Sequence, residues 1–174
     1  MKVILLSLSL TAFSPMPNQA TEITTMLPIT TEIKRGDIDL REYYARIIPP
    51  KYLALIFEAS GRYGIPLYIL TGLIWSESRY NTNCVNRNNN GTFDVGLMQL
   101  NSANTAEFSE RFNFGKRFNP KNPVDNLRIG CQYLNWIYYN PKIGKGGWYK
   151  TLVFWNGSKK SSIILAKFVL GITK

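Results

Sequence analysis

The chain has 174 residues, enough for one domain with a hydrophobic core, and its 21 basic and 11 acidic residues give a net charge of +10. It contains no histidine, which excludes Ser-His-Asp and Cys-His catalysis and every histidine-based metal site. The basic residues are scattered and match no helix-turn-helix or zinc-finger pattern, so we expect no nucleic-acid partner. The positive charge suits a polyanionic surface such as a cell wall, or it serves solubility alone.

The first 20 residues have the pattern of a secretory signal. Lys2 gives the charged start, and residues 3–13 form an apolar run that is too short to span a bilayer. Polar and helix-breaking residues follow up to Ala20, where cleavage is expected; an uncleaved membrane anchor is the alternative. The sequence therefore predicts an exported protein of the periplasm or cell envelope.

Three segments follow this signal. Residues 21–46 are rich in threonine at first and lack a clear hydrophobic period, so we expect a linker or a loosely packed extension. The folded domain is expected over residues 47–174. Its first helix is predicted at residues 50–63 and its second, strongly apolar helix at residues 66–80, with Pro66 at the first helical position.

A polar region separates these helices from the rest of the chain. Residues 81–95 are rich in turn formers, and the run Asn-Arg-Asn-Asn-Asn-Gly at 86–91 is the strongest loop signal. A short helix capped by Asn101 is expected at residues 102–108, followed by irregular structure at 109–121. No alternating pattern of a half-buried strand is evident.

The last part of the chain predicts further helices. The run Asn122-Pro-Val-Asp supplies a cap, a proline in the first position and an acid in the first turn. Residues three and four apart then form a buried stripe: Val124, Leu127, Cys131, Leu134 and Tyr138. Residues 144–147 mark a loop, and helices are expected at 148–155 and 161–170. The fold class is therefore mostly α.

Glu77 lies near the C-terminal end of the second predicted helix. Leu70, Leu73 and Ile74 share its face, because residues three, four and seven apart line up at about 3.6 residues per turn. Burial and the negative end of the helix dipole both raise the pKa of a carboxyl group in such a place. Glu77 is thus a candidate general acid for glycosidic bond cleavage; the alternative is an acid that only marks the polar end of a core helix.

Motifs in a fixed order connect Glu77 with the rest of the chain: Glu77-Ser78, Gly96-Leu-Met-Gln99, Asn122-Pro with Asn126, Gly130 and Tyr133-Leu134, and Phe154-Trp-Asn-Gly157. Over residues 50–172 this series resembles the soluble lytic transglycosylase domain, a lysozyme-like family that cleaves peptidoglycan. The sequence of residues 90–102 also resembles the small specialised transglycosylases that accompany secretion systems, conjugation machines and pili. The resemblance implies a lysozyme-like α-helical domain with a polar loop region around the catalytic groove.

The resemblance also implies roles for single residues. Glu77 would be the sole essential acid and base, and the Ser78 hydroxyl would orient it or the substrate. Seven further residues would line the groove or support the site: Gly96, Leu97, Met98, Gln99, Tyr133, Trp155 and Asn156. Leu97 and Met98 would pack against sugar faces or against the core. Trp155 stands where the family usually has a tyrosine whose hydroxyl lies close to the acid.

Three residues keep two interpretations. Asp94 is either a second carboxylate across the scissile bond or a turn residue that bonds its own backbone. Cys84 and Cys131 are either one disulfide, as an oxidising compartment favours, or two buried thiols. We expect the disulfide.

The reaction implied by the resemblance is a non-hydrolytic cut between N-acetylmuramic acid and N-acetylglucosamine that leaves a 1,6-anhydro end. The expected partners are glycan strands and components of a secretion, conjugation or pilus apparatus. No metal or organic cofactor is implied, and a monomer is expected. The alternatives are a hydrolytic lysozyme and a catalytically weak wall-binding assembly protein.

Overall fold

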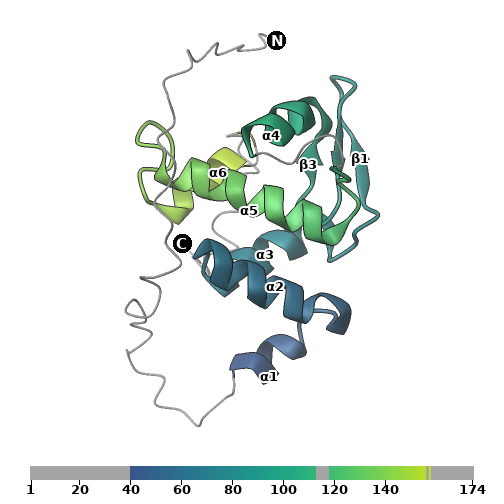
Figure 1. Ribbon diagram of the computed structural model, residues 1–174, viewed down its shortest axis with the longest axis vertical. Coiled ribbons are helices and arrows are strands. Elements are labelled where there is room, and N and C mark those ends of the chain that lie inside the picture. Colours follow the sequence, from purple (N-terminus) through teal and green to yellow (C-terminus); the bar gives the residue numbers. More distant parts are fainter. Residues whose placement is uncertain (1–39, 113–117, 156, 158–174) are drawn as a thin grey trace. The chain divides into compact units, whose positions relative to one another are not determined.

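The computed structural model describes residues 40–112, 118–155 and 157 (Figure 1). The fold is mostly α, as the sequence predicts. Its α-helices are α1 (Leu40–Ala45), α2 (Pro50–Tyr63), α3 (Leu67–Ser78), α4 (Thr105–Arg111), α5 (Pro123–Tyr139) and α6 (Trp148–Trp155). The helix predicted at residues 161–170 lies outside the described residues. Within the described ranges, no helix combines the length and the apolar character needed to cross a membrane.

Helix α1 falls in the last part of the segment that the sequence suggested as a linker. Its Tyr44 ring packs edge-on against Phe57 of α2, with 6.1 Å between the ring centroids. Tyr43 lies beside Tyr44 and is 49% exposed. One short helix of mixed composition gives no periodic signal, so this contact with α2 was not foreseen.

The ends of α2 and α3 fix where the chain turns. Helix α2 has the predicted bounds and stops at Gly64, whose φ of 61° is the left-handed conformation that glycine adopts without strain. Helix α3 begins after Pro66, which is the residue before the helix and not its first member. It ends two residues earlier than predicted, because Arg79 and Tyr80 have φ values of 53° and 60°. Glu77 therefore lies in the last turn of α3.

The structure contains a small antiparallel sheet that the sequence analysis missed. Its strands, in spatial order, are β1 (Val85–Arg87), β2 (Phe93–Val95) and β3 (Leu100–Asn101). Strands of two and three residues are too short for an alternating pattern to stand out. Asp94 in the middle strand pairs with Asn86 on one side and with Asn101 on the other. Asn101 thus ends a strand; a 3₁₀ turn at Ser102–Asn104 leads into α4, which starts later than predicted.

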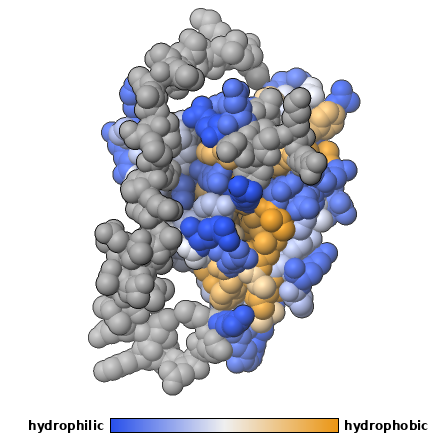
Figure 2. Space-filling view, viewed as in Figure 1, coloured by the Kyte–Doolittle hydropathy of each residue, from blue (hydrophilic) through white to orange (hydrophobic). Residues whose placement is uncertain are grey.

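Helix α5 is the central element of the core. The Asn122 side chain caps it by accepting from the backbone N–H groups of Val124 at 2.9 Å and Asp125 at 3.3 Å, as the sequence predicts. Helix α5 packs against α2 and α6, and its first residues lie beside the sheet (Figure 1). The predicted stripe is buried in its middle, but Val124 in the first turn is 53% exposed. Hydrophilic residues cover much of the surface around a hydrophobic patch (Figure 2).

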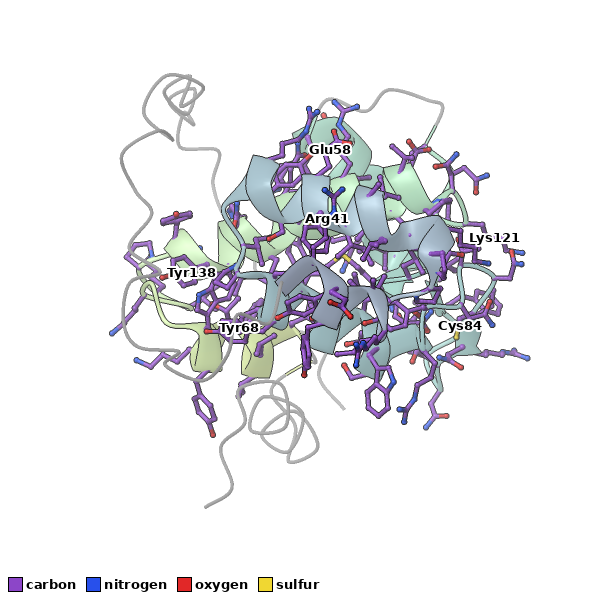
Figure 3. All side chains as sticks on the ribbon, turned by 90° about the horizontal axis from the view of Figure 1, so that it is seen from below. Arg41, Glu58, Tyr68, Cys84, Lys121 and Tyr138 are labelled. Carbon is purple, nitrogen blue, oxygen red and sulfur yellow. The ribbon has the colours of Figure 1, made fainter. Side chains whose placement is uncertain are left out.

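The expected disulfide is absent: Cys84 and Cys131 are both free thiols. Cys84 precedes β1 on the side of the molecule where Lys121 leads into α5 (Figure 3). Cys131 lies about 12 Å along α5 from its first residue, Pro123, at about 1.5 Å of rise per residue, and its side chain is fully buried in the core. The two thiols therefore have different neighbours, and burial raises the pKa of Cys131.

Candidate active site

Glu77 is a partly buried acid whose carboxyl group meets two other residues singled out in the sequence. Burial raises its pKa from the ordinary 4.5 to about 7. A hydrogen bond from the Trp155 side chain acts in the opposite direction, because an indole N–H stabilises the charged form. The negative charge of Asp94 raises the pKa further. The fold thus brings together the end of α3, the middle of the sheet and the end of α6.

Ser78 does not contact the Glu77 carboxylate through its hydroxyl in this structure. The side chain is buried, and its Oγ donates to the backbone carbonyl of Ile74 in the preceding turn of α3, at 3.2 Å. Such a bond back into the helix is a common use of a serine inside a helix. Ser78 therefore contributes to the packing of the last turn that carries Glu77.

Residues Gly96 to Gln99 are buried and do not line an open groove. Leu97 and Met98 are fully buried, so of their two interpretations the structure shows packing in the core. Gly96 has a φ of 82°, and a Cβ at this position would overlap the Pro120 carbonyl oxygen and the Asn126 amide. Glycine is required here because two protein groups approach the backbone closely.

Asn126 holds this loop, and its role was missed in the sequence. The side chain is fully buried on α5. Its Oδ1 accepts from the Met98 backbone N–H at 2.8 Å, and its Nδ2 donates to the carbonyls of Val95 at 3.0 Å and Pro120 at 2.8 Å. The signal that could have revealed this role is a polar residue directly before Leu127 of the buried stripe, because a buried amide needs hydrogen-bond partners.

The Gln99 side chain is also used inside the protein. Its Nε2 donates to the Gly96 carbonyl at 2.9 Å and to the Cys84 carbonyl at 3.2 Å. Its Oε1 accepts from Asn86 Nδ2 at 2.6 Å. The backbone of Gln99 has a φ of 50°, which a non-glycine residue adopts at an energetic cost. These bonds stabilise that conformation and join the loop to β1.

Asp94 is the sequence-predicted residue with the most polar contacts on the sheet. Asn101 Nδ2 donates to one carboxylate oxygen at 2.7 Å, and Asn88 Nδ2 donates to the other at 3.0 Å. The sequence predicted Asn101 as a helix cap and gave Asn88 no role of its own, so neither contact with Asp94 was expected. Asp94 is therefore not a turn residue that bonds its own backbone; it lies on a strand and is oriented by neighbouring side chains.

An aromatic cluster lies next to Glu77. The rings of Tyr133 and Trp155 are 5.5 Å apart, and Tyr133 also packs against Phe108 at 4.7 Å and Trp136 at 5.7 Å. The cluster joins α4, α5 and α6, and it orients the Trp155 indole toward the acid. Asn156 lies outside the described residues. Among the residues described, no group of cysteines and acids is arranged to hold a metal ion.

Comparisons with known proteins show the family of this chain. Residues 54–160 match the family described as the Transglycosylase SLT domain. Two curated relatives, Protein IpgF of Shigella flexneri and Protein IpgF of Shigella sonnei, are each 40% identical over 78 residues, which is 45% of this chain and 51% of the relative. The chain therefore spans about half the length of these relatives, and no solved structure matches it. Because the family match covers more than half of the chain and includes Glu77, Asp94 and Trp155, the protein belongs to the transglycosylase SLT domain family.

Proposed function

We propose that the protein is a lytic transglycosylase that cleaves the β-1,4 bond between N-acetylmuramic acid and N-acetylglucosamine in peptidoglycan. The observation that carries this proposal is the environment of Glu77. A carboxyl group with a pKa of about 7 is protonated in roughly half of the molecules near neutral pH. It is therefore able to donate a proton and later to take one back, which a single catalytic acid must do.

The reaction needs one protein carboxyl group and no cofactor. Protonated Glu77 gives its proton to the glycosidic oxygen, and the bond from that oxygen to the anomeric carbon of the muramic residue breaks. The 2-acetamido group of the same sugar stabilises the positive charge at this carbon. Glu77, now a carboxylate, takes the proton of the sugar's own 6-hydroxyl, whose oxygen attacks the anomeric carbon and closes the 1,6-anhydro ring.

The remaining site residues support Glu77 in this proposal. Trp155 positions its carboxylate, Asp94 places a negative charge nearby, and Tyr133 holds the Trp155 ring. Ser78 and the loop of Gly96 to Gln99 keep the last turn of α3 and the sheet in place.

The setting of the reaction is a further part of the proposal. The signal expected in residues 1–20 supports export to the periplasm or cell envelope. The resemblance of residues 90–102 to specialised transglycosylases supports a role in local wall opening during assembly of an envelope-spanning machine. Peptidoglycan glycan strands would be the substrate, and components of that machine would be the partners.

A hydrolytic lysozyme is the second candidate, and the position of Asp94 beside Glu77 favours it. Glycosidases with two carboxylates place one acid on each side of the scissile bond. In that reaction water attacks in place of the 6-hydroxyl, and Asp94 takes part directly.

The test is a digest of purified peptidoglycan followed by mass spectrometry of the released muropeptides. We expect 1,6-anhydro ends, which weigh one water less than hydrolysed ends. Glu77→Gln should lower the rate by at least the order of 10²–10⁴-fold typical of general acid–base catalysis, whereas Glu58→Gln, at an exposed acid of α2, should leave it unchanged. Asp94→Asn should slow the reaction without changing the product.

Other outcomes contradict the proposal in distinct ways. Predominantly reducing ends, with Asp94→Asn nearly as damaging as Glu77→Gln, indicate a lysozyme. No new ends of either kind, with binding to the wall retained, indicate a wall-binding assembly protein.

A further inference from the structure

Two asparagine side chains hold the Asp94 carboxylate, one on each oxygen. Asn101 Nδ2 donates to Oδ1 at 2.7 Å, and Asn88 Nδ2 donates to Oδ2 at 3.0 Å. Asp94 lies on the middle strand, and Asn101 is its direct cross-strand partner on β3. Hydrogen bonds to a charged acceptor are among the strong ones in proteins. Because the donors sit on different oxygens, any rotation of the carboxylate plane weakens both bonds.

Neighbouring bonds determine which end of each amide faces Asp94. Asn101 Oδ1 accepts from the backbone N–H of Ala103 at 2.9 Å, so its NH₂ group is turned to the carboxylate. The Thr92 hydroxyl accepts from both amides, from Asn101 at 3.0 Å and from Asn88 at 3.2 Å. Both asparagines therefore present donors, which an ionised carboxylate satisfies because it only accepts.

The β1–β2 turn explains why one of three consecutive asparagines reaches the acid. The backbone N–H of Asn88 donates to the Thr92 carbonyl at 2.8 Å, and the Gly91 N–H donates to the Asn88 carbonyl at 3.0 Å. This closed turn directs the Asn88 side chain toward Asp94 on the sheet. Asn90 instead accepts from Thr92, and Asn89 is exposed, with no side-chain hydrogen bond to any described residue. Asn89 is thus a matched control for Asn88.

We propose that Asn88 and Asn101 are positioning residues of the cleavage reaction, which hold the Asp94 carboxylate near Glu77 to stabilise positive charge at the anomeric carbon. This inference rests on the proposed function. A carboxylate that is already oriented need not rearrange when positive charge develops on the sugar. Electrostatic catalysis depends on this preorganisation. Since both asparagines act through Asp94, replacing them should lower kcat only while residue 94 is a charged carboxylate.

A double-mutant cycle tests this dependence. The variants are Asn101→Ala, Asn88→Ala and Asp94→Asn, each single asparagine change combined with Asp94→Asn, and Asn89→Ala as the control. The rate constant kcat is measured from the appearance of new glycan ends, and the melting temperature of each variant shows that it is folded. We expect Asn101→Ala to lower kcat by about tenfold, the low end of the roughly 10–100-fold that partners orienting a functional side chain contribute.

In the Asp94→Asn background the same change should have no further effect, and Asn89→Ala should match the wild type throughout. An equal loss from Asn101→Ala in both backgrounds, or no loss in the wild-type background, overturns the inference.

A second readout does not need activity. The titration of the Glu77 carboxyl group is followed by NMR with ¹³C-labelled glutamate, using Glu77→Gln to assign the signal. Asp94→Asn should lower the pKa of Glu77, because a like charge nearby is removed. Asn101→Ala should lower the pKa of Glu77 by less, because Asp94 keeps its charge but is no longer held in place. A Glu77 titration that is unchanged in Asn101→Ala overturns the inference, even if the wild type releases no new ends and the proposed function fails.

Discussion

Replacing Glu77 with glutamine should stabilise the folded protein at neutral and alkaline pH while it removes activity. Burial raises the pKa of Glu77 to about 7 in the folded state, so the folded protein binds this proton more tightly than the unfolded chain does. Below the unfolded pKa of 4.5 both states are protonated, and the stability linked to this group is fully present. As pH rises through the folded pKa of about 7, that stability is lost.

The size of the effect follows from the two pKa values. Each pKa unit corresponds to about 1.4 kcal/mol, so a rise from 4.5 to about 7 corresponds to about 3 kcal/mol. Glutamine has nearly the same shape and does not ionise. The free energy of unfolding of Glu77→Gln, minus that of the wild type, should therefore grow from a low value near pH ~4 to a value about 3 kcal/mol higher near pH ~8.

Urea unfolding at a series of pH values measures this difference, with tryptophan fluorescence as the signal. Glu58→Gln is the control, because Glu58 is an exposed acid on the surface of α2 that pairs with Arg62 at 2.7 Å (Figure 3). An exposed pair contributes at most about 1 kcal/mol, so the control should change little over the same range. A difference for Glu77→Gln that is independent of pH, or that shrinks as pH rises, would refute the reasoning.

Three further outcomes follow from the site. Trp155→Phe removes the hydrogen bond that lowers the pKa of Glu77, so the alkaline limb of the pH–rate profile should move to higher pH; a move to lower pH contradicts this. Gly96→Ala should lower the free energy of unfolding in urea by at least the roughly 1–3 kcal/mol of a strained backbone, since a Cβ there overlaps the Asn126 amide; a stability within experimental error of the wild type argues against this close approach. Cys84 should react with a thiol reagent in the native protein, and the buried Cys131 only after unfolding. If unfolded protein that was never reduced has no reactive thiol, the two cysteines form a disulfide after all.

The helices were predicted correctly where the signals are local. Asn122 and the following proline mark the start of α5 within four residues of sequence, and the spacing of apolar residues marks its buried face. Gly64 marks the end of α2 in the same way. The sheet was missed because its short strands depend on the turn at residues 88–91 and on pairing with one another, which no short window of sequence contains.

The candidate site was predicted in part for the same reason. Glu77 was singled out by its place on an apolar helix face, Trp155 by the family resemblance and Asp94 by one of its two interpretations. In the structure both residues influence the Glu77 carboxyl group. The roles of Asn88 and Asn101 depend on which acceptor the fold brings within reach, and asparagine in a polar loop suggests a turn first. The disulfide prediction was wrong for a similar reason: the spacing of two cysteines along the chain does not tell how far apart they lie in the folded protein.

The exposed tip of the β1–β2 hairpin offers a place to attach a reporter to this protein. Asn89 is exposed and makes no side-chain hydrogen bond to any described residue, yet its neighbour Asn88 contacts Asp94. A cysteine carrying a fluorophore at position 89 would therefore sit one residue from the carboxylate network without replacing any member of it. Its emission would test in real time whether glycan enters the site, as the proposed function requires, once Cys84 is replaced to give a single reactive thiol.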